Sequence, residues 1–97
     1  IAQISESGPV GTFTNTDNDI LTFEYRNDGG TEYIYYCGQD NILYSRNVTA
    51  GTESTLTIST PGVQCTGKDM HYDAARDSLY FIFQENGMFG IGEYLNP

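Results

Sequence analysis

A single histidine is the residue of this chain best suited by type to acid–base chemistry. His71 stands between Met70 and Tyr72, and imidazole is the side chain whose ordinary pKa lies nearest neutrality. Catalysis by this group would need a nucleophile and an orienting carboxylate beside it, and the sequence shows no such convergent set. We therefore interpret His71 as a surface residue and predict that the protein is not an enzyme.

Acidic residues near the start of the chain have the oxygen chemistry that calcium prefers. Asp17-Asn18-Asp19 resembles the start of an EF-hand loop, which needs Gly at its sixth position and Glu at its twelfth. Thr22 and Asp28 occupy those positions here, so the EF-hand motif fails. A looser site built on Asp17 and Asp19 stays open as an alternative to a simple solvated turn. We predict no resident metal and no cofactor.

Two cysteines, Cys37 and Cys65, are the residues capable of covalent cross-linking. A structural zinc site needs four ligands, and two cysteines with one histidine fall short of that number. The alternatives are a disulfide and a pair of buried free thiols. We favour the disulfide because a small acidic chain rich in Tyr, Thr and Asn is typical of secreted proteins. Closing such a loop contributes about 3–4 kcal/mol by chain entropy, and the predicted compartment is periplasmic or extracellular.

Length and charge exclude several classes of function. The chain has 97 residues, which predicts a single domain over 1–97. Four Lys and Arg residues stand against thirteen Asp and Glu residues, for a formal net charge of −9. Binding of nucleic acid or of anionic lipid requires clustered cations, so we expect neither as a partner. No apolar run reaches the ~18 residues that a membrane-spanning helix needs.

Turn-forming clusters divide the chain into short segments rich in strand-forming residues. The segments lie at 20–26, 32–37, 42–46, 54–59, 63–72, 79–84 and 88–94. In the first of them Leu21, Phe23 and Tyr25 share one face, because successive side chains of a strand alternate. The first three segments are expected to form an antiparallel meander, joined by turn residues that tolerate positive φ.

Interruptions within the later segments have structural meaning. Gly67-Lys68-Asp69 predicts a bulge or loop within 63–72, and Gly90 and Gly92 predict a kink or a close approach in the last strand. No window shows apolar spacing at 3.6 residues. We therefore predict an all-β fold, a single small domain in which about six or seven short strands form an antiparallel meander or sandwich.

Tyrosines are the main candidates for contacts with a partner. Tyr33, Tyr35 and Tyr36 stand on one segment, so both faces of that strand carry aromatic rings. We expect one face to enter the core and the other to expose at least Tyr36, beside Tyr44 or Tyr80. Exposed tyrosine is a good anchor for a protein or a sugar, and the interface candidates are Tyr33, Tyr35, Tyr36 and Tyr44. The alternative is that the rings cover the sheet or lie beneath a segment missing from this chain.

The order of the segments carries a family resemblance. A strand at 19–26 leads through Asn-Asp-Gly-Gly into Glu-Tyr-Ile-Tyr-Tyr at 32–36 and Gly-Gln-Asp-Asn-Ile-Leu-Tyr-Ser-Arg at 38–46. A Thr/Ser-rich strand, Pro-Gly-Val-Gln at 61–64 and Met-His-Tyr at 70–72 follow. Over residues 19–83 this order resembles the globular headgroup of the minor pilins of type IV pili and the pseudopilins of type II secretion systems.

The resemblance implies a non-enzymatic assembly subunit of a bacterial surface filament, whose partners are other pilin or pseudopilin subunits. Such proteins carry a long apolar N-terminal helix. We expect that helix, and not the headgroup, to be the membrane-binding part, and we expect it to have been removed from this chain. The implied location is the periplasmic face of the inner membrane or an extracellular filament. The alternative is a secreted β-sandwich module that binds a glycan or a protein through its exposed tyrosines.

Overall fold

The computed structural model describes residues 2–5, 8–12 and 19–97, and in these residues it contains nine β-strands and no helix. All pairings are antiparallel. A two-stranded hairpin is formed by β1 (Ala2–Ser5) and β2 (Gly8–Thr12). The four-stranded sheet has the order β3 (Ile20–Asp28), β4 (Thr31–Gly38), β5 (Leu43–Asn47), β6 (Thr52–Thr55). The three-stranded sheet has the order β7 (Gln64–Asp73), β8 (Ser78–Glu85), β9 (Met88–Leu95).

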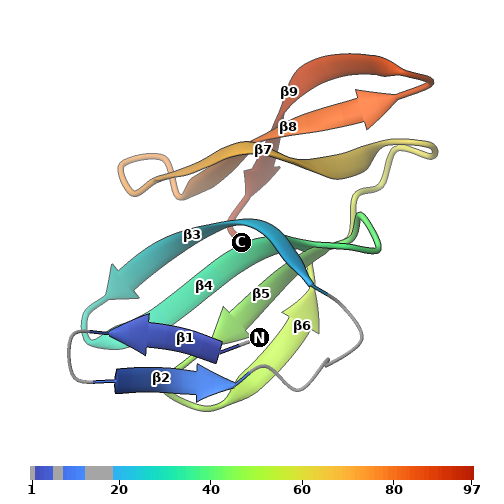
Figure 1. The fold of residues 1–97 in the computed structure, drawn as a ribbon. Coiled ribbons are helices and arrows are strands. Elements are labelled where there is room, and N and C mark those ends of the chain that lie inside the picture. Colours follow the sequence, from blue (N-terminus) through green and yellow to red (C-terminus); the bar gives the residue numbers. More distant parts are fainter. Residues whose placement is uncertain (1, 6–7, 13–18) are drawn as a thin grey trace.

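The seven strands of these two larger sheets confirm the predicted all-β fold (Figure 1). Neighbours in each sheet are also neighbours in sequence, because tight turns join them. Gly29 and Gly30 make the β3–β4 turn at φ of 58° and 99°, and Asn86 and Gly87 make the β8–β9 turn at 51° and 78°. These left-handed conformations suit Gly and Asn and match the twist of the flanking strands.

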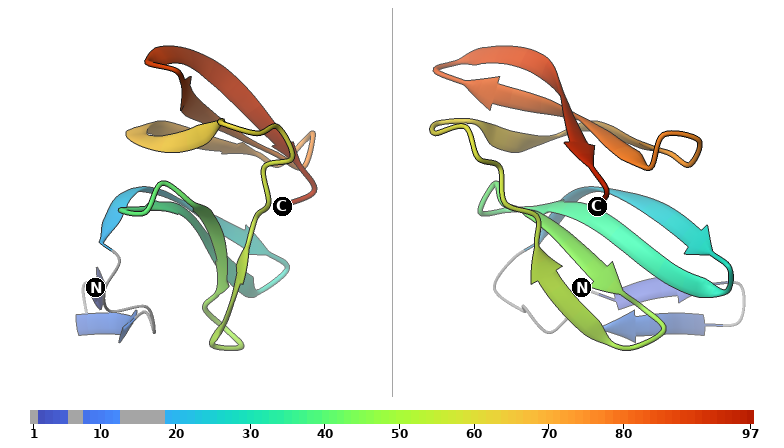
Figure 2. Two further views of the ribbon diagram at one scale, coloured as in Figure 1. Left: turned by 90° about the vertical axis from the view of Figure 1, so that its right-hand side faces the viewer. Right: turned by 180° about the vertical axis from the view of Figure 1, so that it is seen from behind.

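The core lies between the two larger sheets, which face each other in Figure 2. Its fully or nearly buried members come from β4, β5, β7, β8 and the segment after β6: Tyr35, Cys37, Leu43, Leu56, Cys65, Met70, Leu79 and Phe81. A disulfide between Cys37 of β4 and Cys65 of β7 ties the sheets together, with a Cα–Cα distance of 6.0 Å. The predicted disulfide is therefore confirmed, and both cysteines are buried.

Two irregular features of the three-stranded sheet lie at glycine-containing positions that the sequence predicted. The β7–β8 register shifts between Cys65 and Met70, which confirms the predicted irregularity. In the last strand, a Cβ on Gly90 would lie 2.6 Å from Cζ of Phe83, and a Cβ on Gly92 would lie 2.8 Å from Cζ of Phe81. The close approach at these glycines is thus made by aromatic rings of β8 that lie across β9.

Two parts of the described chain differ from the sequence-based expectation. The strand expected at 54–59 is β6, which ends at Thr55, although Leu56 still bonds through its N–H to the carbonyl of Leu43 and is buried. The β1–β2 hairpin was not expected, and it lies on the side of the four-stranded sheet away from β7–β9 (Figures 1 and 2). The acidic turn that includes Asp17 lies outside the described residues.

Candidate interaction surfaces

Tyr33 and Tyr35 lie on the face of the four-stranded sheet that points toward β7–β9. Tyr35 is fully buried, and its ring lies parallel to that of Tyr33 with 6.3 Å between centroids. The Tyr35 hydroxyl accepts a hydrogen bond of 2.9 Å from Nη1 of Arg26 and lies 3.4 Å from the carbonyl oxygen of Pro97. Burial raises the pKa of Tyr35, although the nearby guanidinium opposes that shift. Tyr35 is therefore a core residue whose hydroxyl bonds within the protein, and its ring is not exposed for contacts with a partner.

Arg26 organises a polar cluster between the two sheets. Its guanidinium carbon lies 5.3 Å from the ring centroid of Tyr33 and 4.7 Å from that of Tyr72. Nη1 also lies 3.4 Å from Oδ1 of Asp77, which accepts a 2.7 Å hydrogen bond from the Tyr72 hydroxyl. We call Arg26, Tyr33, Tyr35, Tyr72 and Asp77 the Arg26 cluster. It joins β3 and β4 to β7 and the β7–β8 turn, so its role is to hold the sheets together.

Sequence reasoning missed the Arg26 cluster. In the sequence, the one indication was that Arg26 shares a strand face with Glu24 and Thr22. In the structure, that face is half-buried against β7. A guanidinium is planar and stacks on aromatic rings while it bonds to carboxylates. Such a side chain fits an interior that is lined by tyrosines.

Tyr36 and Tyr44 lie on the opposite face of the four-stranded sheet. Their rings stack with centroids 5.0 Å apart, and each hydroxyl donates a 2.6 Å hydrogen bond to a carboxylate, Tyr36 to Glu53 and Tyr44 to Asp40. Burial, and then the bond to Glu53, raises the pKa of Tyr36. The bond to Asp40, and then burial, raises the pKa of Tyr44 to about 12.

The expected exposure of Tyr36 was wrong, since only 1 % of this residue is accessible. β4 lies inside the sheet between β3 and β5, so its side chains are flanked on both sides. Tyr36 and Ile34 form a second small cluster, packed against Ile20, Tyr44 and Val48. The stacking of Tyr36 on Tyr44 agrees with the expectation that these two residues lie side by side.

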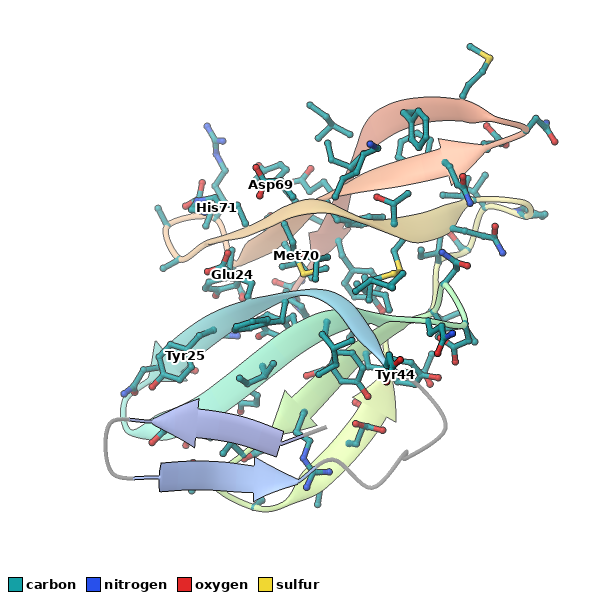
Figure 3. The ribbon with its side chains drawn as sticks, viewed as in Figure 1. Glu24, Tyr25, Tyr44, Asp69, Met70 and His71 are labelled. Carbon is teal, nitrogen blue, oxygen red and sulfur yellow. A yellow bond between two sulfur atoms is a disulfide. The ribbon has the colours of Figure 1, made fainter. Side chains whose placement is uncertain are left out.

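An exposed apolar stripe runs along β3 on this same outer face. It consists of Phe23 and Tyr25, which we call the β3 stripe, and Phe23 is 59 % accessible. Leu21 was expected on the same face, but it lies at the bulge of β3 beside β7, where a Cβ on Gly67 would lie 3.2 Å from its own Cβ. The register pairs Phe23 with Tyr36 and Tyr25 with Ile34 across the sheet, so the stripe continues the second apolar cluster to the sheet edge. In Figure 3, Tyr25 lies on the opposite side of β3 from Glu24, which points toward β7.

A second exposed apolar set lies on β9 and comprises Met88, Phe89, Ile91 and Leu95. Ile91, which is 74 % accessible, borders a shallow pocket with Ile82, Tyr80, Asp69 and His71. Figure 3 shows Asp69 and His71 on the side of β7 away from the four-stranded sheet, and Met70 toward it. His71 is exposed and pairs across the strands with Tyr80.

Searches for a metal site and for a membrane span gave nothing in the described residues. No group of three or more His, Cys, Asp or Glu side chains within residues 2–5, 8–12 and 19–97 has the geometry to hold a metal ion. In the same ranges there is no helix with the length and apolar character needed to cross a membrane. Comparison with protein-family models, curated protein sequences and solved structures gave no significant match.

Proposed function

We propose that this chain is a structural or assembly subunit of a bacterial surface filament, the headgroup of a minor pilin or pseudopilin. It acts through protein–protein contacts and not through catalysis. The surface that makes these contacts is the outer face of the four-stranded sheet, where the β3 stripe is exposed. The occupant of that face is the apolar N-terminal helix of such proteins or a neighbouring subunit.

The β3 stripe is the observation that carries this proposal. Contiguous exposed apolar side chains on a folded domain mark contact surfaces, and aromatic residues are enriched in protein interfaces. Phe23 and Tyr25 stand on an antiparallel sheet whose other face is already covered by β7–β9. A helix laid on the outer face over β3 would complete a second layer of packing together with the β1–β2 hairpin, which lies on the same side of the sheet (Figures 1 and 2).

The disulfide and the segment order support the compartment and the family. A disulfide persists in oxidising environments such as the periplasm and the extracellular space, and Cys37–Cys65 is one. The order of strands and turns over residues 19–83 resembles pilin headgroups. The periplasmic face of the inner membrane or a filament outside the cell is accordingly the proposed location.

Photo-crosslinking of the full-length protein in its native cell envelope tests the proposal. A photoreactive phenylalanine at Phe23 should cross-link to an apolar helix of the same chain or to a pilin subunit. The same probe at exposed Asp69, on the far side of the molecule, should not. The coding sequence upstream of Ile1 should contain about 20 consecutive apolar residues, the length of a membrane-spanning helix. A cleavable signal peptide directly before Ile1, with no cross-link from Phe23, would refute the proposal.

The alternative, a secreted binding module for a glycan or a protein, has one specific observation in its favour. The Tyr36–Tyr44 stack is flanked by the carboxylates of Asp40 and Glu53, and an aromatic face with polar neighbours is a common sugar-binding arrangement. Tyr44 is the half-buried and therefore accessible ring of the pair. Glycan-array binding that is lost in Tyr44→Ala but kept in Phe23→Ser would favour this alternative.

A further inference from the structure

The free edge of β9 is unusual among the strand edges of this protein. Proteins protect exposed strand edges with short strands, bulges, Pro or Lys. β6 is four residues long, and β3 and β7 each contain a bulge and lie beside one another. β9 is eight residues long, pairs with β8 without a register shift, and contains neither Pro nor Lys. In the described part of the chain no strand pairs with its other side.

The hydrogen-bond pattern shows which groups point away from the sheet. The N–H of Asn96 donates to the carbonyl of Asp77 at 2.9 Å, so these two residues form a hydrogen-bonded pair that continues the β8–β9 ladder. Successive residues of an antiparallel strand alternate between bonding inward and pointing outward. The N–H and C=O groups that point outward from β9 therefore belong to Phe89, Ile91, Glu93 and Leu95.

A groove adjoins this edge on the inner side of the sheet. It has a volume of about 500 Å³ and lies between β8–β9 and the segment of residues 57–63, which links the two sheets. Its apolar lining includes Ile58, Val63, Phe83 and Tyr94. The rings of Phe83 and Phe81 reach this region because Gly90 and Gly92 carry no side chains. A strand added to β9 would thus place alternate side chains in the groove.

The other side chains of an added strand would lie on the outer face of the sheet. Successive strand residues point to opposite faces, and the outer face beside β9 presents Phe89, Ile91 and Leu95, all exposed. One edge therefore offers outward main-chain donors and acceptors, an apolar outer surface and an apolar inner groove. This combination is the one by which extended peptides bind to sheet edges.

Charge indicates what kind of segment would bind. Glu85 lines the groove, Glu93 borders it at the strand edge, and no Lys or Arg is found among the described residues that line it. The Glu93 carboxylate lies on the outer face, where it accepts hydrogen bonds from Ser78 and Tyr80. The nearby cation Lys68 is placed over the Phe89 ring. The chain as a whole carries a formal charge of −9, so pairing of two copies would bring like charges together, whereas a cationic segment would be attracted.

We propose that the edge of β9 binds an extended, cationic segment of a partner protein, which becomes the fourth strand of the β7–β9 sheet. The segment has apolar side chains at alternate positions and Lys or Arg near Glu85 and Glu93. This site is on the opposite side of the molecule from the β3 stripe and does not rest on the proposed function. Its test therefore includes a variant of the β3 stripe as an internal control.

The probe is the acetylated and amidated heptapeptide KVTVTVK, titrated into the ¹⁵N-labelled protein. The expected result is a set of chemical-shift changes and slower amide exchange at Phe89, Ile91, Glu93 and Leu95. Ile91→Pro removes one outward N–H and leaves the β8 ladder intact, since Pro is tolerated at a strand edge. It should weaken binding by about tenfold, a difference of 1.4 kcal/mol. Ile91→Thr, which keeps the N–H but loses apolar surface, should weaken binding less than Ile91→Pro does. Phe23→Ser in the β3 stripe should bind as the parent protein does.

The charge requirement has its own controls. The peptide EVTVTVE should bind about tenfold more weakly than KVTVTVK, and Glu85→Lys should narrow that difference. Equal affinity for both peptides, shifts confined to the β3 stripe, or no shifts with millimolar peptide would overturn the proposal. A dimer of the protein alone in light scattering that becomes monomeric in Ile91→Pro would also overturn it, because a second copy would then be the occupant.

Discussion

Replacement of Arg26 by methionine should destabilise the protein much more than the same replacement at a surface arginine. Methionine retains much of the volume and flexibility of the Arg26 side chain, which is 17 % accessible. It cannot donate to the Tyr35 hydroxyl, which receives a 2.9 Å hydrogen bond, nor attract the rings of Tyr33 and Tyr72 electrostatically. The substitution thus removes the centre of the Arg26 cluster without opening a large cavity.

The contacts of Arg26 set the expected magnitude. A hydrogen bond from a charged group contributes about 1.5–3 kcal/mol, and each cation–π contact about 0.5–1 kcal/mol. The pair with Asp28 is largely exposed and adds little. Removing the cost of burying a charge offsets part of the sum, which leaves a loss of about 2–3 kcal/mol. For a domain of this size that corresponds to a fall in Tm of roughly 10–20 °C.

Urea denaturation followed by circular dichroism, analysed by linear extrapolation, measures the effect. Arg76→Met is the matched control, because the Arg76 side chain is 71 % accessible and its loss should change stability by no more than about 0.5 kcal/mol. Arg26→Lys keeps the charge but not the planar fork and should fall between the parent and Arg26→Met. Equal stabilities of Arg26→Met and Arg76→Met would refute the reasoning, since the cluster would then contribute nothing beyond its packing.

Further predictions concern the cross-link, the glycines and alkaline pH. Replacing both Cys37 and Cys65 with Ala, which opens a loop spanning 28 positions, should cost about 3–4 kcal/mol of unfolding free energy; a loss below about 1 kcal/mol in urea titrations would contradict the loop-entropy account. Gly92→Ala should cost about 1–3 kcal/mol by overpacking, because its Cβ would meet the Phe81 ring at 2.8 Å, with displacement of that ring visible by NMR. Burial and the bond to Asp77 raise the pKa of Tyr72 to about 12, and the bond to Asp40 raises that of Tyr44 to about 12. Since tyrosine in the unfolded chain ionises near pH ~10, the folded state binds more protons above that pH, and stability that is fully present below pH ~10 should decline toward pH ~12. Urea midpoints measured across this range should fall less steeply in Tyr44→Phe, and a flat profile in the parent protein would exclude the effect.

Local chemistry explains why the strands could be located from the sequence. Gly29-Gly30 and Asn86-Gly87 adopt the positive φ angles that their residue types favour. A strand needs only alternation and strand-forming residues between such turns, so the strand segments emerged at nearly the observed positions, with β6 ending early. The composition, typical of secreted proteins, favoured a disulfide between Cys37 and Cys65 over two free thiols, and the structure contains that disulfide. The bulge in β7 followed from Gly67, Lys68 and Asp69.

The candidate surfaces could be predicted only in part. The sequence placed Leu21, Phe23 and Tyr25 on one face of a strand, and the structure exposes Phe23 and Tyr25 there, whereas the bulge in β3 places Leu21 beside Gly67 of β7. Alternation with period two is the same whichever face is buried, so it carries no information on which side another sheet covers. Tyr36 was expected at the surface for this reason and proved to be buried beside Tyr44.

The amino-acid sequence by itself thus determined the acidic charge, the turns and most of the strands of the two larger sheets, and it favoured the disulfide, because each depends on neighbouring residues or on composition. Only the tertiary structure decided that the strands divide into two facing sheets, that Arg26 lies among tyrosines in the interior, and that Phe23 and Ile91 stay exposed. These features depend on contacts between residues far apart in the chain. The free edge of β9 belongs to the same group, since an edge exists only by virtue of what the rest of the fold leaves unpaired.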